Sequence, residues 1–375
     1  MSKILKFLLH FKLRIMIPSE KKIIVFDPAT SFHLYKILSQ YEYTFLKARK
    51  EEINLYVLLL TILRFWDYQN LTFYQKYLIN QIKIINPKII ITCTSHNSFL
   101  LSLKKFFPNL KIVVIQHASL SEITLNEILA KCKKDNLSRK YKIDYVCTFG
   151  ASGRDFYSKF VDAKEYIITG SIKNNYFKEK KVINDKVVFI SQFRFRNGKM
   201  RQIITKKYEK FLFKNLRHYC ENMKKKLYVL SCNQTRQNEE KSYFDRVIGK
   251  GNYKFLHKLD WSSSYKYALN YKFFITHSST LGWELMARGK RTAFLFEFHR
   301  RVKKNKSPYS TFYAKNYNGP FWTNTYNSKK LKKILDNSFY CNQLELEKNK
   351  KKFINPLVIY NKDNLILKNL IKKIY

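Results

Sequence analysis

The chain has 375 residues, of which 45% are hydrophobic and 16% aromatic, enough apolar material for more than one packed core. This composition excludes a chain that is disordered over most of its length. Its 72 lysines and arginines outweigh 27 aspartates and glutamates, and the resulting net charge of +45 attracts polyanions such as nucleic acid, anionic lipid headgroups or phosphorylated substrates. The same excess arises where an AT-rich genome fills neutral surface positions with lysine, so both interpretations stay open.

The sequence also indicates what to expect of the cysteines, of metal ions and cofactors, and of contact with a membrane. Six cysteines without a C-x-x-C pair favour reduced thiols in a cytosolic protein. No D-x-D sequence occurs, and no His, Asp and Glu residues have metal-ligand spacing, so we expect neither a metal nor a resident cofactor. The longest apolar run, Ile53–Leu63, is shorter than the roughly 20 residues that span a bilayer. Met1–Ile17 lacks a signal-peptide pattern and is either a first element of the fold or a segment at the inner face of the plasma membrane.

Short apolar runs alternate with longer amphipathic stretches along the first half of the chain, which is typical of βαβ units. Strands are predicted at Lys22–Phe26, Lys88–Thr92, Lys111–Ile115, Tyr145–Thr148 and Tyr166–Thr169, and helices at Ser31–Ser39 and Tyr74–Ile85. Continuous β-branched runs of this kind fit strands of a parallel sheet that is covered on both faces.

The polar, Asn- and Lys-rich stretch Ser171–Lys186 predicts a crossing between two domains. A second series follows, with strands at Lys186–Ser191, Lys226–Ser231, Tyr253–Phe255, Phe273–Thr276 and Thr292–Phe296, helices at Gln202–Met223, Trp261–Leu269 and Leu281–Arg288, and largely helical Leu331–Asp336 and Leu344–Tyr375. The predicted fold class is α/β, with two Rossmann-like doubly wound domains that face a cleft. We place their bounds at residues 1–175 and 176–345, and residues 346–375 form a helical tail that could pack back on the N-terminal domain.

Ligands of doubly wound sheets bind beyond the carboxyl ends of the strands, so residues that follow the predicted strands are candidates for chemistry. Asp27 is either a general base or the cap of the next helix. His117 is either an acid or base, or a hydrogen-bonding residue within its loop. The small-residue turn Gly150–Gly153 suits either a phosphate or a close contact between domains.

Ser191 and Arg194 follow the first strand of the second half and supply a hydroxyl and a guanidinium group. Arg194 either clamps a pyrophosphate or lies in a solvated loop. We include both residues among the candidates that bind an activated donor.

The most informative segment is Phe273–Leu295. It reads as a buried strand, a hydroxyl-rich turn, a short helix that stops at Gly289 and a second strand. Side-chain hydroxyls and the N–H groups of a helix start suit a phosphate or a sugar. Glu284 misses the capping-box position from either Ser279 or Thr280, which favours a carboxylate facing the cleft. The candidate donor-binding residues are therefore Ser191, Arg194, His277, Ser278, Ser279, Thr280 and Glu284.

Ser278–Lys290 resembles the donor-site signature of GT-B glycosyltransferases, although Lys290-Arg291 stands where many members have proline. The wider pattern comprises V-V-I-Q-H-A (Val113–Ala118), D-Y-V-C-T-F-G (Asp144–Gly150), I-I-T-G-S-I-K-N-N (Ile167–Asn175) and V-F-I-S-Q-F (Val188–Phe193). With these segments the chain resembles bacterial surface-carbohydrate biosynthesis proteins, which are related to the CDP-glycerol glycerophosphotransferase and capsule Kdo/polysialic-acid transferase groups. Those groups have His-Gly where this chain has His117-Ala118.

The resemblance implies metal-independent transfer of a sugar from a nucleotide-sugar donor to a surface polysaccharide such as O-antigen or capsule. It implies a base in the N-terminal domain, for which Asp27 and His117 are the candidates, and a lipid-linked or glycan acceptor near an anionic membrane surface. A CDP-polyol phosphotransferase and a nucleotide-sugar epimerase are alternatives on the same scaffold. A nucleic-acid-binding protein is disfavoured, because the sequence has no RRM, helix-turn-helix or zinc-finger pattern.

Overall fold

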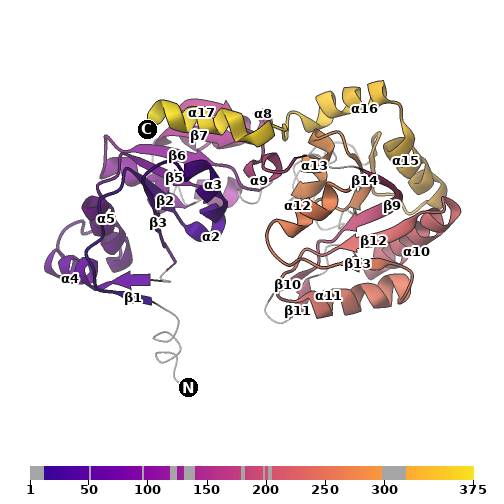
Figure 1. Ribbon diagram of the computed structural model, residues 1–375, viewed down its shortest axis with the longest axis horizontal. Coiled ribbons are helices and arrows are strands. Elements are labelled where there is room, and N and C mark those ends of the chain that lie inside the picture. The colour runs from indigo at the N-terminus through magenta and orange to yellow at the C-terminus, as the bar shows by residue number, and fades with distance from the viewer. Residues whose placement is uncertain are drawn as a thin grey trace, which may run out of the picture.

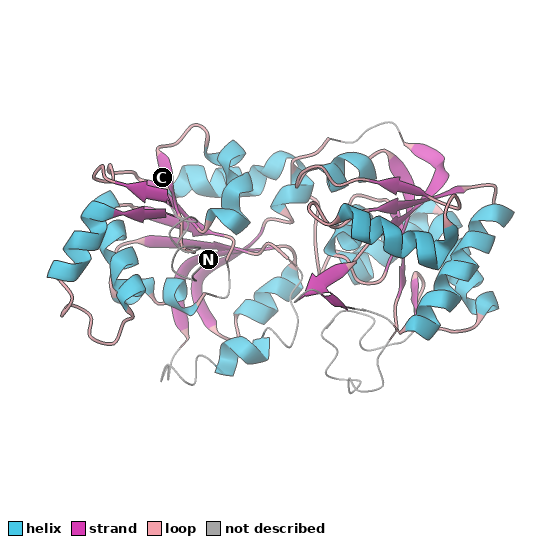
Figure 2. Cartoon of the chain, turned by 90° about the horizontal axis from the view of Figure 1, so that it is seen from below, coloured by secondary structure: helices cyan, strands magenta, loops and turns pink. Residues whose placement is uncertain are grey.

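The structure is a computed structural model of the chain. It describes residues 12–49, 52–94, 97–118, 125–130, 140–178, 182–196, 199–201, 205–297 and 318–375. Two lobes lie side by side along the longest axis, each around its own sheet (Figure 1). Seen from below, helices flank the sheets of both lobes (Figure 2). This is the two-domain α/β architecture that the sequence predicts.

The N-terminal lobe contains a six-stranded, fully parallel sheet in the order β3-β2-β5-β6-β7-β8. Its strands are β2 (Ile23–Phe26), β3 (Tyr43–Leu46), β5 (Ile89–Thr92), β6 (Lys111–Ile115), β7 (Tyr141–Thr148) and β8 (Val161–Ile168). Alternate residues of β2 point to opposite faces, so Ile24 and Phe26 enter one core while Ile23 and Val25 enter the other. Burial on both faces explains why these strands read as continuous apolar runs.

Two helices that are far apart in the chain, α5 and α17, cover the two faces of this sheet. One face packs against α5 (Phe73–Ile85). A capping box formed by Thr72 and Gln75 stabilises the start of this helix. On the other face lies α17 (Leu365–Ile374), which buries Leu367, Leu370, Ile371 and Ile374 beside β2, β5 and β6. The last helix of the chain therefore completes the core of the first lobe.

The C-terminal lobe has a second parallel sheet in the order β13-β12-β9-β14-β15-β16. Its strands are β9 (Ile183–Ile190), β12 (Lys226–Leu230), β13 (Lys254–Leu256), β14 (Tyr271–Thr276), β15 (Arg291–Leu295) and β16 (Trp322–Thr323). One face packs against α10 (Lys206–Asn222), α11 (Gln237–Phe244) and α15 (Ser328–Tyr340). The other packs against α12 (Ser263–Ala268) and α13 (Thr280–Ala287).

The chain crosses between the lobes twice, and the two crossings contact each other. The first contains α9 (Ile172–Asn175), and the second follows α16 (Gln343–Asn349) and leads to α17. Asn175 donates to Asn364 Oδ1 (2.9 Å), and its own side-chain oxygen accepts from Asn361 N (2.9 Å). A Cβ at Gly150 would lie 2.5 Å from the carbonyl oxygen of Pro356, so only glycine permits this approach. Of the two options for the turn at residues 150–153, the structure shows the close contact with the second crossing.

Most elements match the predicted segments, and the differences have local causes. The predicted helix Ser31–Ser39 is split into α2 (Pro28–Ser31), a 3₁₀ turn and α3 (Tyr35–Leu38). The predicted helical stretch Leu344–Tyr375 is interrupted before α17 by the segment around Pro356, which lacks the N–H that a helix interior needs. Further elements are β1 (Lys12–Arg14), β4 (Glu52–Asn54), α4 (Leu55–Leu63), α6 (Ser98–Leu101), α8 (Ala151–Tyr157), β10 (Arg194–Arg196) and β11 (Lys199–Arg201).

None of the helices in the described part of the chain is both long enough and apolar enough to cross a bilayer.

Candidate functional site

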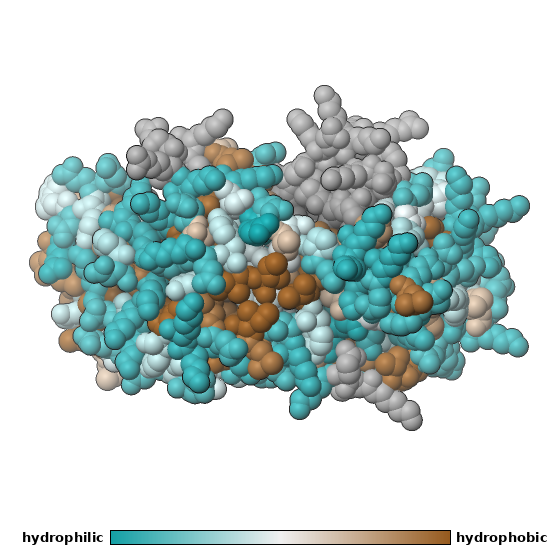
Figure 3. Space-filling view, turned by 90° about the horizontal axis from the view of Figure 1, so that it is seen from above, coloured by the Kyte–Doolittle hydropathy of each residue, from teal (hydrophilic) through white to brown (hydrophobic). Residues whose placement is uncertain are grey.

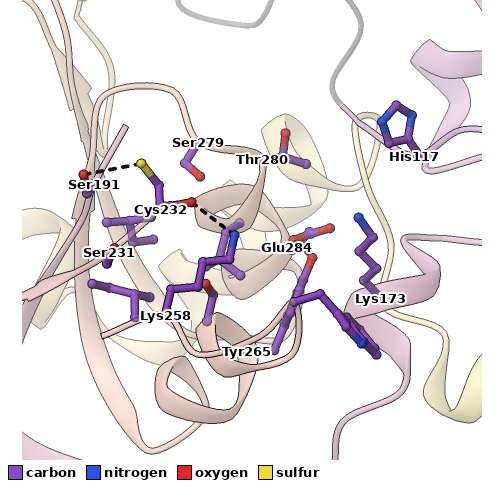
Figure 4. A pocket seen from close by; sticks show the side chains of 15 residues that line it. His117, Lys173, Ser191, Ser231, Cys232, Lys258, Tyr265, Ser279, Thr280 and Glu284 are labelled. Carbon is purple, nitrogen blue, oxygen red and sulfur yellow. Dashed lines mark hydrogen bonds between the residues drawn. The ribbon is translucent and has the colours of Figure 1, made fainter. Parts of the chain in front are cut away.

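A cavity of about 260 Å³ lies between the lobes, at the carboxyl ends of four strands of the second sheet (Figure 4). Residues that follow β9, β12, β13 and β14 form its wall on the C-terminal lobe. His117, which follows β6 of the other lobe, and Lys173 of α9 face that wall. The cavity is thus located where doubly wound sheets bind ligands. Its lining residues are His117, Lys173, Ile190, Ser191, Leu230, Ser231, Cys232, Lys258, Trp261, Ser264, Tyr265, Ser279, Thr280, Leu281 and Glu284.

The first turn of α13 opens onto this cavity. Ser279 has the extended backbone of an N-cap residue, but its side chain makes no capping hydrogen bond. Ser279 and Thr280 both line the cavity (Figure 4). The N–H groups of the first turn of a helix point toward the helix start and carry the positive end of the helix dipole. This turn can therefore receive the oxygens of a phosphate group.

Gln192 holds the turn before α13 in place. Its side-chain oxygen accepts from Ser278 N (2.7 Å), and its side-chain nitrogen donates to Ser278 Oγ (3.2 Å). Ser278 is buried and does not belong to the cavity lining. The structure thus gives Ser278 a role in shaping the turn and brings Ser279 and Thr280 to the cavity.

Glu284 lies one helical turn further into α13, at the cavity wall, and is only 2% exposed. Its Oε2 accepts from the Tyr265 hydroxyl (2.9 Å), and its Oε1 accepts from the Ser171 hydroxyl. Burial raises the pKa of Glu284, while the hydrogen bonds from Ser171 and Tyr265 and the charge of Lys173 oppose the rise. The carboxylate therefore both borders the cavity and joins α13 to the first crossing.

Two lysines give the cavity a positive character. Lys173 points toward the space between His117 and Glu284, and Lys258 approaches from the opposite side (Figure 4). The Lys258 ammonium group donates to the carbonyl oxygen of Cys232 (3.1 Å). Of the lining residues that the structure describes, Glu284 alone carries a carboxylate. The balance of charge favours an anionic ligand.

Glu240 is a site-forming residue that the sequence analysis missed. It is fully buried, and its carboxylate accepts from Ser231 Oγ (2.6 Å), Cys232 N (3.1 Å) and Asn233 N (3.1 Å). These bonds fix the loop that follows β12 and lines the cavity. The neighbouring Glu239 is exposed, and no pattern in the sequence distinguishes the two.

Cys232 and Ser191 contact each other in the cavity wall, with 3.7 Å between Ser191 Oγ and Cys232 Sγ. Burial raises the pKa of the Cys232 thiol to about 12, so the sulfur stays protonated and is a poor nucleophile. Ser191 is brought to the cavity, as expected for a residue at the end of β9.

Asp27 ends β2 with a left-handed backbone (φ 56°) and is nearly fully buried. Its carboxylate is bound by Arg49 through Nη2–Oδ2 (2.8 Å) and Nε–Oδ1 (3.1 Å), and it accepts from Thr94 Oγ1 (2.8 Å). Asp27 stands at the N-cap position of α2, and its backbone oxygen accepts from Thr30 N and Ser31 N, but its side chain makes no capping hydrogen bond. Asp27 does not belong to the cavity lining either, because the ion pair holds it within the N-terminal lobe.

His117 is the predicted N-terminal site residue that does reach the cavity. His33 of the same lobe is 1% exposed. Burial is the main cause that lowers the pKa of His33 to about 3, and the charges of Lys173 and His117 add to it. The Trp261 ring contacts Phe32 edge to face, with 5.6 Å between ring centroids. This aromatic contact joins the two lobes beside the cavity.

His277 lies inside the C-terminal lobe and not in the cavity lining. Its Nδ1 is 2.6 Å from the carbonyl oxygen of Leu295, and its ring packs edge to face on Phe189. Burial lowers the pKa of His277 to about 4, so the ring is neutral near pH 7 and donates to Leu295. The side chain of Arg194 lies outside the part of the chain that the structure describes.

Residues 113–375 match the model of a family described as "putative O-antigen biosynthesis protein". The chain belongs to this O-antigen biosynthesis family. The match begins within β6, shortly before His117, and runs to the last residue, so it includes both crossings and the whole C-terminal lobe. No curated protein sequence matches the chain.

Solved structures of two kinds share the fold. A crystal structure of UDP-N-acetylglucosamine 2-epimerase is 13% identical, with a TM-score of 0.53 over 95% of both chains. The enzyme of this name from Methanocaldococcus jannaschii is 11% identical, with a TM-score of 0.54 over 93% of this chain and 99% of that one. A variant of the wall teichoic acid polymerase TagF is 13% identical, with a TM-score of 0.54 over 95% of this chain and 89% of that one. The fold is GT-B, and fold and family together indicate an enzyme of surface-glycan biosynthesis.

Proposed function

We propose that this protein is a glycosyltransferase that moves a sugar from a nucleotide-activated donor to a surface polysaccharide acceptor such as O-antigen, without a metal ion. One observation carries the proposal. The cavity joins a helix start and two lysines, which suit a diphosphate, to a histidine from the opposite lobe, which suits proton transfer.

The donor is held by the C-terminal lobe. The phosphates lie at the first turn of α13, where Ser279 and Thr280 donate hydrogen bonds and Lys258 and Lys173 supply positive charge. As the bond between the anomeric carbon and the phosphate oxygen breaks, negative charge grows on that oxygen. Fixed dipoles and ammonium groups stabilise this charge and replace the metal ion that other transferases use.

The acceptor is activated from the N-terminal lobe. His117 takes the proton of the acceptor hydroxyl while the hydroxyl oxygen bonds to the anomeric carbon. The nucleotide leaves with both electrons of the broken bond. Of the two base candidates, we assign this role to His117, because the Asp27 carboxylate is bound by Arg49 and lies away from the cavity. Glu284 has lone pairs beyond the two bonds that it accepts, and these can receive a hydroxyl of the sugar or the ribose.

A second candidate is transfer of a polyol phosphate from a CDP-activated donor. The two cavity lysines favour this reaction as much as sugar transfer, because a phosphoryl group that is being transferred needs the same positive charge as a leaving phosphate. The epimerase alternative needs only the nucleotide sugar and no acceptor.

The test is a thermal-shift screen with UDP, GDP, CDP and CMP, followed by product analysis with the activated form of the best nucleotide. A ligand at a hundred times its dissociation constant stabilises a protein by about 2.7 kcal/mol, a readily measured shift. A glycosidic product and a released nucleotide support the proposal. A phosphodiester product supports the second candidate, turnover of the donor alone supports an epimerase, and no stabilisation by any nucleotide contradicts all three.

A further inference from the structure

The N-terminal lobe has an exposed apolar surface around α4. Large side chains project into solvent from α4, from the segment that follows β1, from the turn after α4 and from the start of α5. The most exposed are Met16 (84%), Leu63 (81%) and Trp66 (79%). We call this the α4 surface, and its exposed residues are Ile15, Met16, Ile17, Tyr56, Leu59, Ile62, Leu63, Phe65, Trp66 and Phe73. Proteins that remain monomeric in water rarely leave so many neighbouring apolar side chains exposed.

The apolar side chains are exposed because α4 is apolar all round and only one face packs inward. Val57 and Thr61 are fully buried on the inner face. Tyr56, Leu59 and Leu63 recur at the spacing of the opposite face, and all three are exposed. The nine residues of α4 include no charged residue, so its outer face lacks the polar stripe of an ordinary surface helix.

Buried polar contacts hold the α4 surface in place. Asn54 caps α4 by accepting from Val57 N (3.1 Å), and it donates to the carbonyl oxygen of Met16 (2.7 Å). The Lys76 ammonium group, although buried, bonds to the carbonyl oxygen of Phe65 and lies 4.5 Å from the centroid of the Phe65 ring. The surface is therefore preformed, because the segment after β1 and the turn after α4 are both anchored.

Cationic residues border the α4 surface. Lys12 and Arg14 lie on β1, and Arg64 directly follows α4. The nearby Glu52 carboxylate is paired with both Arg14 (2.5 Å) and Lys47 (2.7 Å), so its charge is neutralised locally. Among the residues that the structure describes, neither Lys12 nor Arg64 forms an ion pair, and both remain exposed. Asp67, in the same turn as Trp66, is an exposed carboxylate beside these cations, but Lys12 and Arg64 outnumber it, so the rim complements an anionic partner.

We propose that the α4 surface docks this protein on a bilayer that contains anionic lipids, with α4 parallel to the membrane plane. Leucine and isoleucine side chains enter the edge of the acyl region, the tryptophan and tyrosine rings lie among the headgroups, and the lysine and arginine side chains bind lipid phosphates. Figure 3, which looks down on the upper side of Figure 1, shows a face that is hydrophilic around an apolar patch near its centre. This docking does not depend on the reaction that the cavity performs.

The test is flotation of the full chain with vesicles of equal parts phosphatidylcholine and phosphatidylglycerol, and with vesicles of phosphatidylcholine alone. We expect binding to the mixed vesicles, weaker binding to the neutral ones, and loss of part of the binding at high salt. The variant Leu59→Ser/Leu63→Ser/Trp66→Ser should bind the mixed vesicles at least about tenfold more weakly. The matched control is Leu259→Ser/Leu344→Ser/Leu365→Ser, which removes three other exposed leucines and should bind like the wild type.

Each alternative occupant has its own outcome. Unchanged flotation of the α4 variant, with a lower melting temperature, means that another segment of the chain covers the surface and overturns the proposal. A change from dimer to monomer in light scattering without a change in flotation means that a second copy covers it, with the same consequence. Equal weakening by the control variant shows a nonspecific apolar effect and also contradicts the proposal.

Discussion

Ser171, which directly precedes α9, donates its hydroxyl to the buried carboxylate of Glu284 in α13. The contact fastens the first crossing between the lobes to the helix whose start opens onto the cavity. A second contact supports it, because Asn174 Nδ2 donates to the backbone oxygen of Glu284 (3.2 Å). Glu284 thereby joins the first crossing between the lobes to the cavity wall of the C-terminal lobe.

The first prediction separates the two roles of Glu284. In Glu284→Gln the shape is kept, and one amide oxygen still accepts a bond, so the free energy of unfolding should change by no more than about 1 kcal/mol. Glu284→Ala leaves the Ser171 and Tyr265 hydroxyls without their acceptor and should lower it by about 2–4 kcal/mol. Both values can be measured by denaturant unfolding. The Gln variant should also show a smaller thermal shift with the best nucleotide, and an unchanged shift would remove Glu284 from the donor site.

The second prediction concerns the base. His117→Asn should lower kcat by about a hundredfold to ten-thousandfold, because a positioned acid or base contributes that much, while nucleotide stabilisation stays as in the wild type. Asp27→Asn is the comparison variant, since asparagine tolerates the left-handed backbone at this position. It weakens the ion pair with Arg49 and should lower stability while turnover persists. A full loss of turnover in a folded Asp27→Asn protein, with His117→Asn active, would reverse the assignment.

The third prediction concerns charge in the cavity. Lys258→Met should weaken nucleotide binding by roughly tenfold to a hundredfold, because a hydrogen bond from a charged group contributes about 1.5–3 kcal/mol. Lys266→Met removes the same charge from the exposed part of α12 and should bind the nucleotide normally. Titration calorimetry with the best nucleotide compares the two. Equal weakening in both variants would indicate a long-range field effect and not a contact in the cavity.

The fourth prediction follows from His277. Its pKa is about 4 in the folded protein against 6.5 for the free side chain, so the unfolded chain binds the extra proton first as the pH falls. The stability that His277 contributes is complete above pH 6.5 and is lost as the pH falls from 6.5 toward 4. The slope due to this residue approaches about 1.4 kcal/mol per pH unit.

His277→Asn keeps a donor for the Leu295 carbonyl and should flatten the dependence of unfolding free energy on pH in that window. His218→Asn, at an exposed position on α10, should leave the dependence unchanged. A profile for His277→Asn that parallels the wild type would show that this histidine is not held neutral. The buried His33 contributes a slope of the same sign, which both variants retain.

Much of the fold follows from the sequence because the strands of the two sheets are buried on both faces and stand out as apolar runs. Shorter strands with polar or mixed composition were not predicted, such as β3 (Tyr43–Leu46) and β16 (Trp322–Thr323). These lie at sheet edges, where pairing with one neighbour and tertiary contacts decide the structure. The break before α17 has a local signal in Pro356, whereas the contact of Asn175 with Asn364, which fixes the crossing there, joins residues far apart in the chain.

The candidate site could be predicted where it follows strand ends and not where it depends on packing. Ser279, Thr280 and His117 are found at the cavity because position after a strand is a topological property. His277 is turned into the lobe, although it stands in the same motif, because the Leu295 carbonyl and the Phe189 ring take up its side chain. No local pattern reveals such partners, and the same holds for the buried carboxylate of Glu240.

Hydrogen exchange with and without the best nucleotide tests directly whether the nucleotide binds in the cavity between the lobes, because it reports which backbone N–H groups a ligand protects. We expect protection of the amides at residues 279–282, at the start of α13, and of the loop at residues 231–233, with α10 unchanged. Lys258→Met should reduce that protection at the same nucleotide concentration. Protection confined to other segments, or none at a concentration that stabilises the protein, would contradict a donor site in the cavity between the lobes.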